Sequence, residues 1–149
     1  MNMINLTIDG VAVSVPAGTS ILDAAKAAGV RIPTLCYLRG INEIGACRMC
    51  VVDIGARAFA AACVMPVSEG MKVKTNTPAV REARKINLEL LLSNHEKQCL
   101  SCVRSTNCEL QAMSREYGVT DENLYEGSMT PHDIDEVSPS IVRNNAKCV

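Results

Sequence analysis

The heptapeptide GACRMCV, residues 45–51, places two cysteines on either side of only two residues, after a glycine and an alanine. Cys47 and Cys50 are close enough in the chain for both sulfurs to bind one metal centre. Two further cysteines flank this segment, Cys36 and Cys63, so that the four follow the pattern C-x10-C-x2-C-x12-C. Four thiolates are the usual ligands of a 2Fe-2S cluster, a 4Fe-4S cluster or a structural zinc ion.

Two features of this segment favour iron over zinc. Zinc ribbons usually contain two CxxC pairs, whereas this pattern has one pair and two single cysteines. Gly45 and Ala46 have almost no side chain, so backbone N–H groups there can approach the sulfide of a cluster and donate hydrogen bonds that tune its potential. We therefore expect Gly45 and Ala46 to line the cofactor. Zinc ligation, and single cysteines that are merely buried, are the alternatives.

Composition favours a metal-stabilised protein in a reducing compartment. The chain has 149 residues with one Phe, three Tyr and no Trp, and 48% of them are apolar. If the chain forms two domains of about 75 residues each, both have small, light cores, and domains that small often need a metal or a disulfide for stability. The N-terminal stretch MNMINLTIDG has no basic segment and no long apolar segment, so we expect no signal peptide and a cytoplasmic location. Cysteines in that compartment bind metals more often than they form disulfides.

Charge and hydropathy argue against several classes of function. The chain has 15 basic and 16 acidic side chains, a balance that creates no field for a polyanion, so nucleic acid is not an expected partner. No stretch approaches about 18 consecutive apolar residues, so we expect no membrane span. The sequence has no GxGxxG or GxxxxGK loop and no carboxylate pair or nucleophile triad. We therefore expect no active site within these residues.

Hydrophobic periodicity predicts a small α+β region in the first half of the chain. Residues 4–15 alternate apolar and polar side chains around Asp9-Gly10, which predicts a β-hairpin. A helix is predicted after a capping Ser20 and ends at Gly29. Three further short strands are expected at residues 49–54, 57–62 and 71–75.

A second region begins at Pro78 and is predicted to be helical as far as about Asn94. Its expected apolar face contains Val80, Ala83, Ile86, Asn87, Leu90 and Leu91. Its expected polar face contains Arg81, Glu82, Arg84, Lys85 and Glu89. A second short helix is predicted from Asn107 to Tyr117. From Val119 onward the chain is acidic, contains Pro131 and Pro139 and shows no sustained period, so we interpret it as an extended arm.

A second cluster of candidate ligands lies at the end of the long helix. His95, Cys99, Cys102 and Cys108 follow the pattern H-x3-C-x2-C-x5-C. Three cysteines need one more ligand, and His95, one helical turn before Cys99, is the nearest candidate. An imidazole in place of a thiolate should raise the potential of a cluster, as it does in Rieske centres. The alternative is a solvated histidine that is favoured by the helix C-terminus.

The two patterns together, LCYLRGINEIGACRMCVVDI and NHEKQCLSCVRSTNCELQ, closely resemble the N-terminal iron–sulfur region of modular iron-only hydrogenases. The same region occurs in the large iron–sulfur subunit of respiratory complex I and in some NAD-linked formate dehydrogenases. The resemblance implies an α+β fold in three parts. A β-grasp, ferredoxin-like 2Fe-2S domain would occupy residues 1–77, a small helical 4Fe-4S domain residues 78–118, and an extended arm residues 119–149.

The resemblance also implies the ligands of each cluster. For the 2Fe-2S cluster they are Cys36, Cys47, Cys50 and Cys63. For the 4Fe-4S cluster they are His95, Cys99, Cys102 and Cys108. Cys148, in the ending NNAKCV, matches the first ligand of a further cluster, so we expect the chain to be part of a longer subunit.

The function that the resemblance implies is electron transfer. The chain would pass single electrons between a partner subunit, which binds flavin, NAD(P) or further iron–sulfur clusters, and the catalytic remainder of its own parent chain. The stretches CLSCVRSTNCELQ and SPSIVRNNAKCV favour a hydrogenase as the parent. A complex I-like subunit or a formate dehydrogenase is the alternative parent, and a zinc-stapled interaction module without redox function is the alternative of another class.

Overall fold

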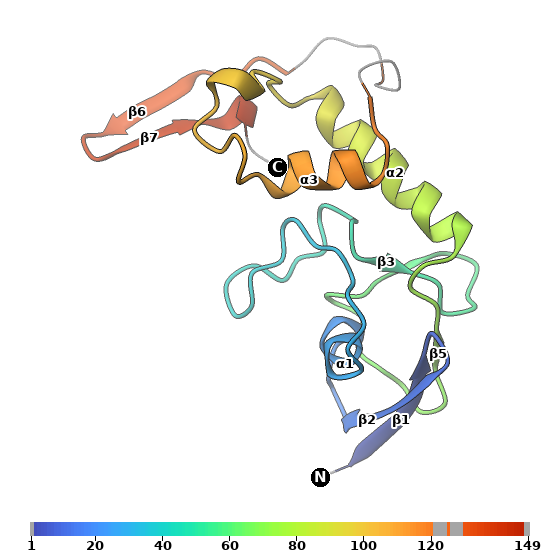
Figure 1. Cartoon of the computed structure of the whole chain (residues 1–149). Helices are drawn as coiled ribbons and strands as arrows, with labels where there is room; N and C mark the ends of the chain where they lie inside the picture. The colour runs from blue at the N-terminus through green and yellow to red at the C-terminus, as the bar shows by residue number, and fades with distance from the viewer. Residues whose placement is uncertain (1, 121–124, 126–129, 148–149) are drawn as a thin grey trace. The chain divides into compact units, whose positions relative to one another are not determined.

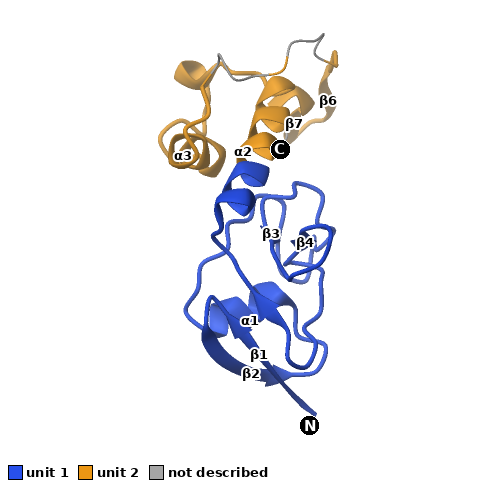
Figure 2. Cartoon of the chain, turned by 90° about the vertical axis from the view of Figure 1, so that its right-hand side faces the viewer, with its two compact units in different colours: residues 1–84 blue, residues 85–149 orange. Residues whose placement is uncertain are grey.

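The computed structural model describes residues 2–120, 125 and 130–147. The chain divides into two compact units, residues 1–84 and residues 85–149, which Figure 2 shows in blue and orange. The two units meet within helix α2 (Pro78–Ser93), whose first turns belong to unit 1, and Arg84 in these turns donates a hydrogen bond to the Val51 carbonyl.

Unit 1 begins with a three-stranded sheet (Figure 1). Strands β1 (Met3–Ile8) and β2 (Val11–Pro16) form the predicted antiparallel hairpin. Its turn residues Asp9 and Gly10 both have positive φ, as a tight two-residue turn requires. Strand β5 (Lys72–Val73) pairs parallel with β1, so the order is β2-β1-β5 and the predicted edge strand is confirmed.

Helix α1 (Ile21–Ala27) buries its apolar face in the same core as the sheet. The predicted cap is present, because the Ser20 side chain accepts a hydrogen bond from the Asp23 N–H at 3.1 Å. The N–H groups of Ile21 and Leu22 donate to backbone carbonyls of the segment 62–65 at 2.9 Å. The start of the helix therefore fixes the segment that contains Cys63.

A second, two-stranded sheet brings distant cysteines together. Strands β3 (Val51–Val52) and β4 (Ala60–Ala61) pair antiparallel and are shorter than the predicted strands. Cys50 directly precedes β3, and Cys63 follows two residues after β4. Both cysteines are therefore delivered to the same end of this small sheet.

In its described residues, unit 2 contains the rest of α2 and five shorter elements. They are η1 (Cys99–Ser101), α3 (Glu109–Glu116), β6 (Ile134–Ser138), β7 (Ile141–Asn144) and η3 (Asn145–Lys147). The two helices were predicted to within about two residues at each end. The β6–β7 hairpin was not, because we interpreted Pro139 as a break, whereas it lies in the turn that joins two strands. The expected extended arm is therefore partly a hairpin.

The buried face of α2 differs from the predicted one. Val80, Arg84 and Leu88, four residues apart, are buried, and so is Glu89, whose carboxylate lies 3.8 Å from Lys85 Nζ. Leu90, expected on the apolar face, is 52% exposed. Hydrophobic periodicity misplaced the face because it assigns every charged residue to solvent. None of the helices in the described ranges is long and apolar enough to cross a membrane.

The Ser20 cap gives a first prediction. Substitution Ser20→Ala removes the acceptor for the Asp23 N–H and should cost about 1 kcal/mol. In a unit of this size that loss lowers the thermal midpoint by about 4–8 °C, which scanning calorimetry of unit 1 within the full chain would measure. The control is Ser68→Ala, at an exposed loop serine, and an equal shift in both variants would show that the cap does not stabilise α1.

Candidate metal centres

The four cysteines of the first pattern lie together in unit 1 as two pairs. The Cys50 thiol donates to Cys63 Sγ at 3.3 Å, and Cys36 Sγ accepts from the Cys47 N–H at 3.5 Å. The charges of Cys36, Cys47 and Cys50 all act on the Cys63 thiol. The two pairs are therefore neighbours in unit 1.

Burial dominates the chemistry of the Cys50–Cys63 pair. Both thiols are part of the hydrophobic core, with Cys50 1% and Cys63 4% exposed. Burial first, and then the hydrogen bond with Cys50 and the charge of Cys50, raise the pKa of Cys63 to about 12. Metals bind the thiolate, so a metal cation bound at this site would have to replace the thiol proton.

Backbone amides surround the other pair. Burial acts to raise the pKa of Cys47, but hydrogen bonds from the N–H groups of Met49, Cys36 and Leu35 outweigh it, and the pKa is lowered. The pKa of Cys36 is raised, mainly by burial, although the Cys47 and Ala46 amides act in the opposite direction. Amides that point at sulfur stabilise a thiolate and tune a metal centre. The loop thus presents N–H groups to sulfur, and they belong to Leu35, Cys36, Ala46, Cys47 and Met49.

Gly45 has a packing role beside this loop. Its φ is +66°, and a Cβ added there would lie 3.3 Å from Val64 Cγ2 and 3.6 Å from Ala61 Cβ. Those atoms belong to the segment just before and just after Cys63. The small size of Gly45 therefore lets the two ligand-bearing segments approach each other.

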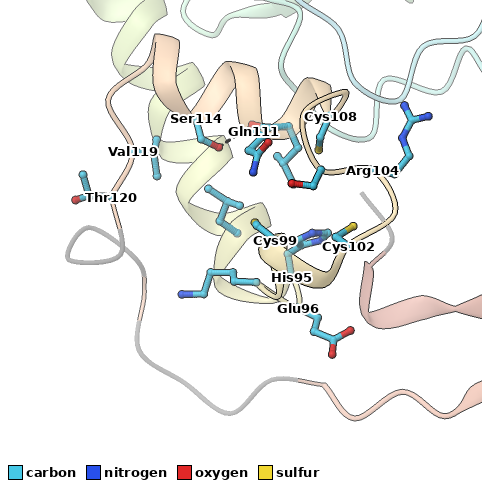
Figure 3. Close-up of a pocket in the computed structure, with 14 residues that line it drawn as sticks. His95, Glu96, Cys99, Cys102, Arg104, Cys108, Gln111, Ser114, Val119 and Thr120 are labelled. Atoms are coloured by element: carbon cyan, nitrogen blue, oxygen red, sulfur yellow. Dashed lines mark hydrogen bonds between the residues drawn. The ribbon is translucent and has the colours of Figure 1, made fainter.

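The second set of candidate ligands lines one cavity in unit 2. The cavity has a volume of about 440 Å³, and His95, Cys99, Cys102 and Cys108 all contribute to its walls (Figure 3). His95 Nδ1 is buried and, within the part of the chain that the structure describes, has no hydrogen-bond partner. A buried nitrogen in that state costs free energy unless something binds it. A metal centre in the cavity would supply the missing partner.

Local structure explains how these side chains reach the cavity. Helix α2 ends at Ser93, and the His95 N–H still donates to the Leu92 carbonyl. Element η1 begins at Cys99, and Cys108 is the residue that precedes the first turn of α3. The ligands therefore come from the ends of helices and from the loop between them, where the backbone can curve around a bound group.

Glu96, next to His95, is tied to the C-terminal part of unit 2. Its N–H donates to the Ala146 carbonyl at 2.8 Å, and its carboxylate accepts from Asn144 Nδ2 at 3.1 Å and lies 3.7 Å from Lys147 Nζ. No sequence pattern predicts this contact, because a single charged residue after a helix gives no signal for a partner about 50 residues away. The contact holds the backbone beside His95.

The described residues contain no group of three His, Cys, Asp or Glu side chains placed to hold a single metal ion. The candidate ligands are arranged instead as two pairs in unit 1 and as cavity walls in unit 2. Cys148 lies outside the described residues.

Comparison with known proteins gives a family for each unit. Residues 1–78 match the model of a 2Fe-2S iron–sulfur cluster binding domain. The chain belongs to this family. Residues 84–123 match the iron–sulfur binding region of NADH-ubiquinone oxidoreductase-G. The chain therefore contains a 2Fe-2S domain followed by a 4Fe-4S-binding region, and the expectation of iron rather than zinc is confirmed.

Individual relatives agree with this family. The chain is 46% identical to the NADP-reducing hydrogenase subunit HndD of Solidesulfovibrio fructosivorans, matching 100% of this chain and 26% of that protein. It is 38% identical to an NADH-quinone oxidoreductase subunit of Rhizobium meliloti (strain 1021), over 99% of this chain and 18% of the relative. The chain thus spans about a quarter or less of these relatives.

A solved structure supports the same conclusion. The crystal structure of an NAD+-reducing [NiFe]-hydrogenase in the H2-reduced state matches 91% of this chain and 57% of its own, with a TM-score of 0.82 and 30% identity. The predicted resemblance to hydrogenases and complex I is confirmed by these matches. The chain is an iron–sulfur electron-transfer module.

The packing of Gly45 gives a second prediction. Substitution Gly45→Ala strains a left-handed residue, at roughly 1–2 kcal/mol, and also presses a methyl group against Val64. We expect less 2Fe-2S cluster per chain after anaerobic reconstitution, measured by the visible absorption and iron content.

Gly55 supplies the matched control, because its φ is +76° and a Cβ there would meet nothing within 4 Å. Gly55→Ala carries the same backbone strain without a contact like that with Val64. It should therefore retain more 2Fe-2S cluster per chain than Gly45→Ala. Equal cluster content in the two variants would contradict the packing role of Gly45.

Proposed function

We propose that the chain holds a 2Fe-2S cluster on Cys36, Cys47, Cys50 and Cys63. The pairing of these cysteines supports the assignment. A 2Fe-2S cluster has two irons, and each iron takes two protein ligands. Two neighbouring pairs of cysteines match that demand. Cys50 and Cys63 are paired through their sulfurs, and Cys36 and Cys47 through a backbone N–H and a side-chain contact. This pairing is the observation on which the proposal chiefly rests.

The proposed ligands of the 4Fe-4S cluster are His95, Cys99, Cys102 and Cys108. Their position around one cavity supports a multinuclear cluster, since side chains on the walls of a cavity of about 440 Å³ can reach a group much larger than an ion. The buried Nδ1 of His95 supports imidazole ligation. Because imidazole is neutral, this ligand set carries less negative charge than four thiolates.

The arrangement of unit 1 supports a β-grasp fold. A hairpin, a parallel third strand and one helix in the same core correspond to the expected ferredoxin-like domain. We also propose Gly45 and Ala46 as residues that shape the cluster loop, Gly45 through its close approach to Val64 and Ala46 through its N–H near Cys36.

Each cluster, when bound, would accept and release one electron at a time. The protein contributes low exposure around Cys50 and Cys63, which keeps water from the sulfurs, and amides around Cys47, which stabilise negative charge there. These residues act by ligation, burial and hydrogen bonding, without proton transfer to a substrate.

The parent enzyme that we propose is a hydrogenase-type oxidoreductase linked to NAD(P). The identity to HndD, whose name is that of an NADP-reducing hydrogenase subunit, supports it. The chain would pass electrons between a partner redox subunit and the catalytic part of the parent enzyme, and a cytoplasmic location is part of the proposal. A complex I-like parent is the second candidate, favoured by the 38% identity to the NADH-quinone oxidoreductase relative.

Exchanging one ligand in each unit tests the ligand sets. Cys50→Ser should abolish the 2Fe-2S signal in electron paramagnetic resonance and leave the 4Fe-4S signal. Cys102→Ser is the reciprocal variant. It should abolish the 4Fe-4S signal and leave the 2Fe-2S signal, because each unit holds its own centre. An unchanged 2Fe-2S spectrum in Cys50→Ser would contradict the assignment.

His95 has its own test. His95→Cys replaces a neutral ligand with a charged thiolate, so the midpoint potential of the 4Fe-4S cluster should fall. His132→Ala, at an exposed histidine, is the control and should leave it unchanged. A 4Fe-4S potential that is the same in His95→Cys and in the unsubstituted chain would show that another group is the fourth ligand.

A further inference from the structure

Arg84 is a buried arginine on helix α2. Only 3% of it is exposed, and its Nη2 donates to the Val51 carbonyl at 2.7 Å. Arginine is almost never buried to this extent without a specific interaction. A guanidinium stays protonated in proteins, so this position carries a buried positive charge. The charge contacts the residue that directly follows the proposed ligand Cys50.

The contact holds the backbone that carries this ligand. Val51 begins β3 and pairs with Ala61 in β4, while the Cys50 carbonyl accepts from the Ala62 N–H at 3.1 Å. The same two segments place the Cys50 and Cys63 sulfurs 3.3 Å apart. By binding the Val51 carbonyl, Arg84 fixes one end of this arrangement.

The charge has a second consequence. Reduction adds one electron to a cluster that already bears the charge of four thiolates, so a nearby cation stabilises the reduced form more than the oxidised form. The effect is larger in the interior than at the surface, where water and salt screen a charge. A buried guanidinium beside the Cys50 segment should therefore raise the reduction potential of the 2Fe-2S cluster.

We propose that Arg84 is a positioning residue for the 2Fe-2S cluster, which holds the Val51 carbonyl beside Cys50 and raises the reduction potential of the cluster. This inference rests on the proposed ligation by Cys50. It assigns a redox role to a residue of α2 that lies outside both cysteine patterns.

The same helix supplies a matched control. Arg81 lies one turn earlier on α2 and is exposed, and its Nη1 donates to Asn76 Oδ1 at 3.4 Å. Arg81→Met removes the same charge from the same helix at a position in contact with water. The 4Fe-4S cluster in the same chain serves as an internal reference for the potential.

The experiment is a redox titration of the full chain, reconstituted with both clusters and followed by electron paramagnetic resonance. In Arg84→Met the ratio of reduced to oxidised 2Fe-2S cluster at a fixed potential should fall about tenfold, equivalent to a midpoint about 59 mV lower. Arg84→Lys, which keeps the charge, should stay within about threefold of the unsubstituted chain. Arg81→Met should change neither cluster, and the 4Fe-4S midpoint should be constant throughout.

Equal 2Fe-2S midpoints in Arg84→Met and in the unsubstituted chain would overturn the inference. If Arg84→Met fails to assemble the cluster, Arg84→Gln provides a second neutral variant with the same expected fall. Loss of the 2Fe-2S cluster in both neutral variants would show that Arg84 has only a packing role. That result would also overturn the inference. Failure of the proposed function would look different, because the unsubstituted chain would then lack the 2Fe-2S signal.

Discussion

The interaction on which unit 1 depends is the contact between two thiols inside its core. Cys50 and Cys63 lie 3.3 Å apart and pack with the same residues that hold β1 and α1 together. Two thiolates at that distance in a low-dielectric interior repel each other strongly, and the raised pKa of Cys63 reflects burial first and the neighbouring thiol second. A bound cation would offset this repulsion, which would couple metal binding to the formation of this core.

The same constraint explains the surroundings of the cysteines. The first turn of α1 donates N–H groups to the segment before and after Cys63, Gly45 allows Val64 to approach, and Arg84 binds the carbonyl after Cys50. Each contact fixes a sulfur through the backbone next to it. In unit 2 the proposed ligands lie at the ends of helices and in the loop between them, around a cavity. Glu96 there anchors the backbone after His95.

Local patterns predicted much of this structure from the sequence. The β1–β2 hairpin follows from alternation around Asp9-Gly10, and α1 from its serine cap, because both depend on residues that are close in the chain. Cysteine spacing found the candidate ligands for the same reason. Their pairing was not predictable, since it depends on how β3 and β4 align. The burial of Arg84 was missed because a charged side chain in a helix normally indicates solvent.

We conclude that each unit is built around an iron–sulfur cluster, and Mössbauer spectroscopy of the anaerobically purified chain, combined with iron and acid-labile sulfide analysis, would measure both clusters. We expect about six iron atoms and about six sulfide ions per chain, in two spectroscopic populations with an iron ratio of about one to two. Zinc without sulfide, or iron in a single population, would contradict it.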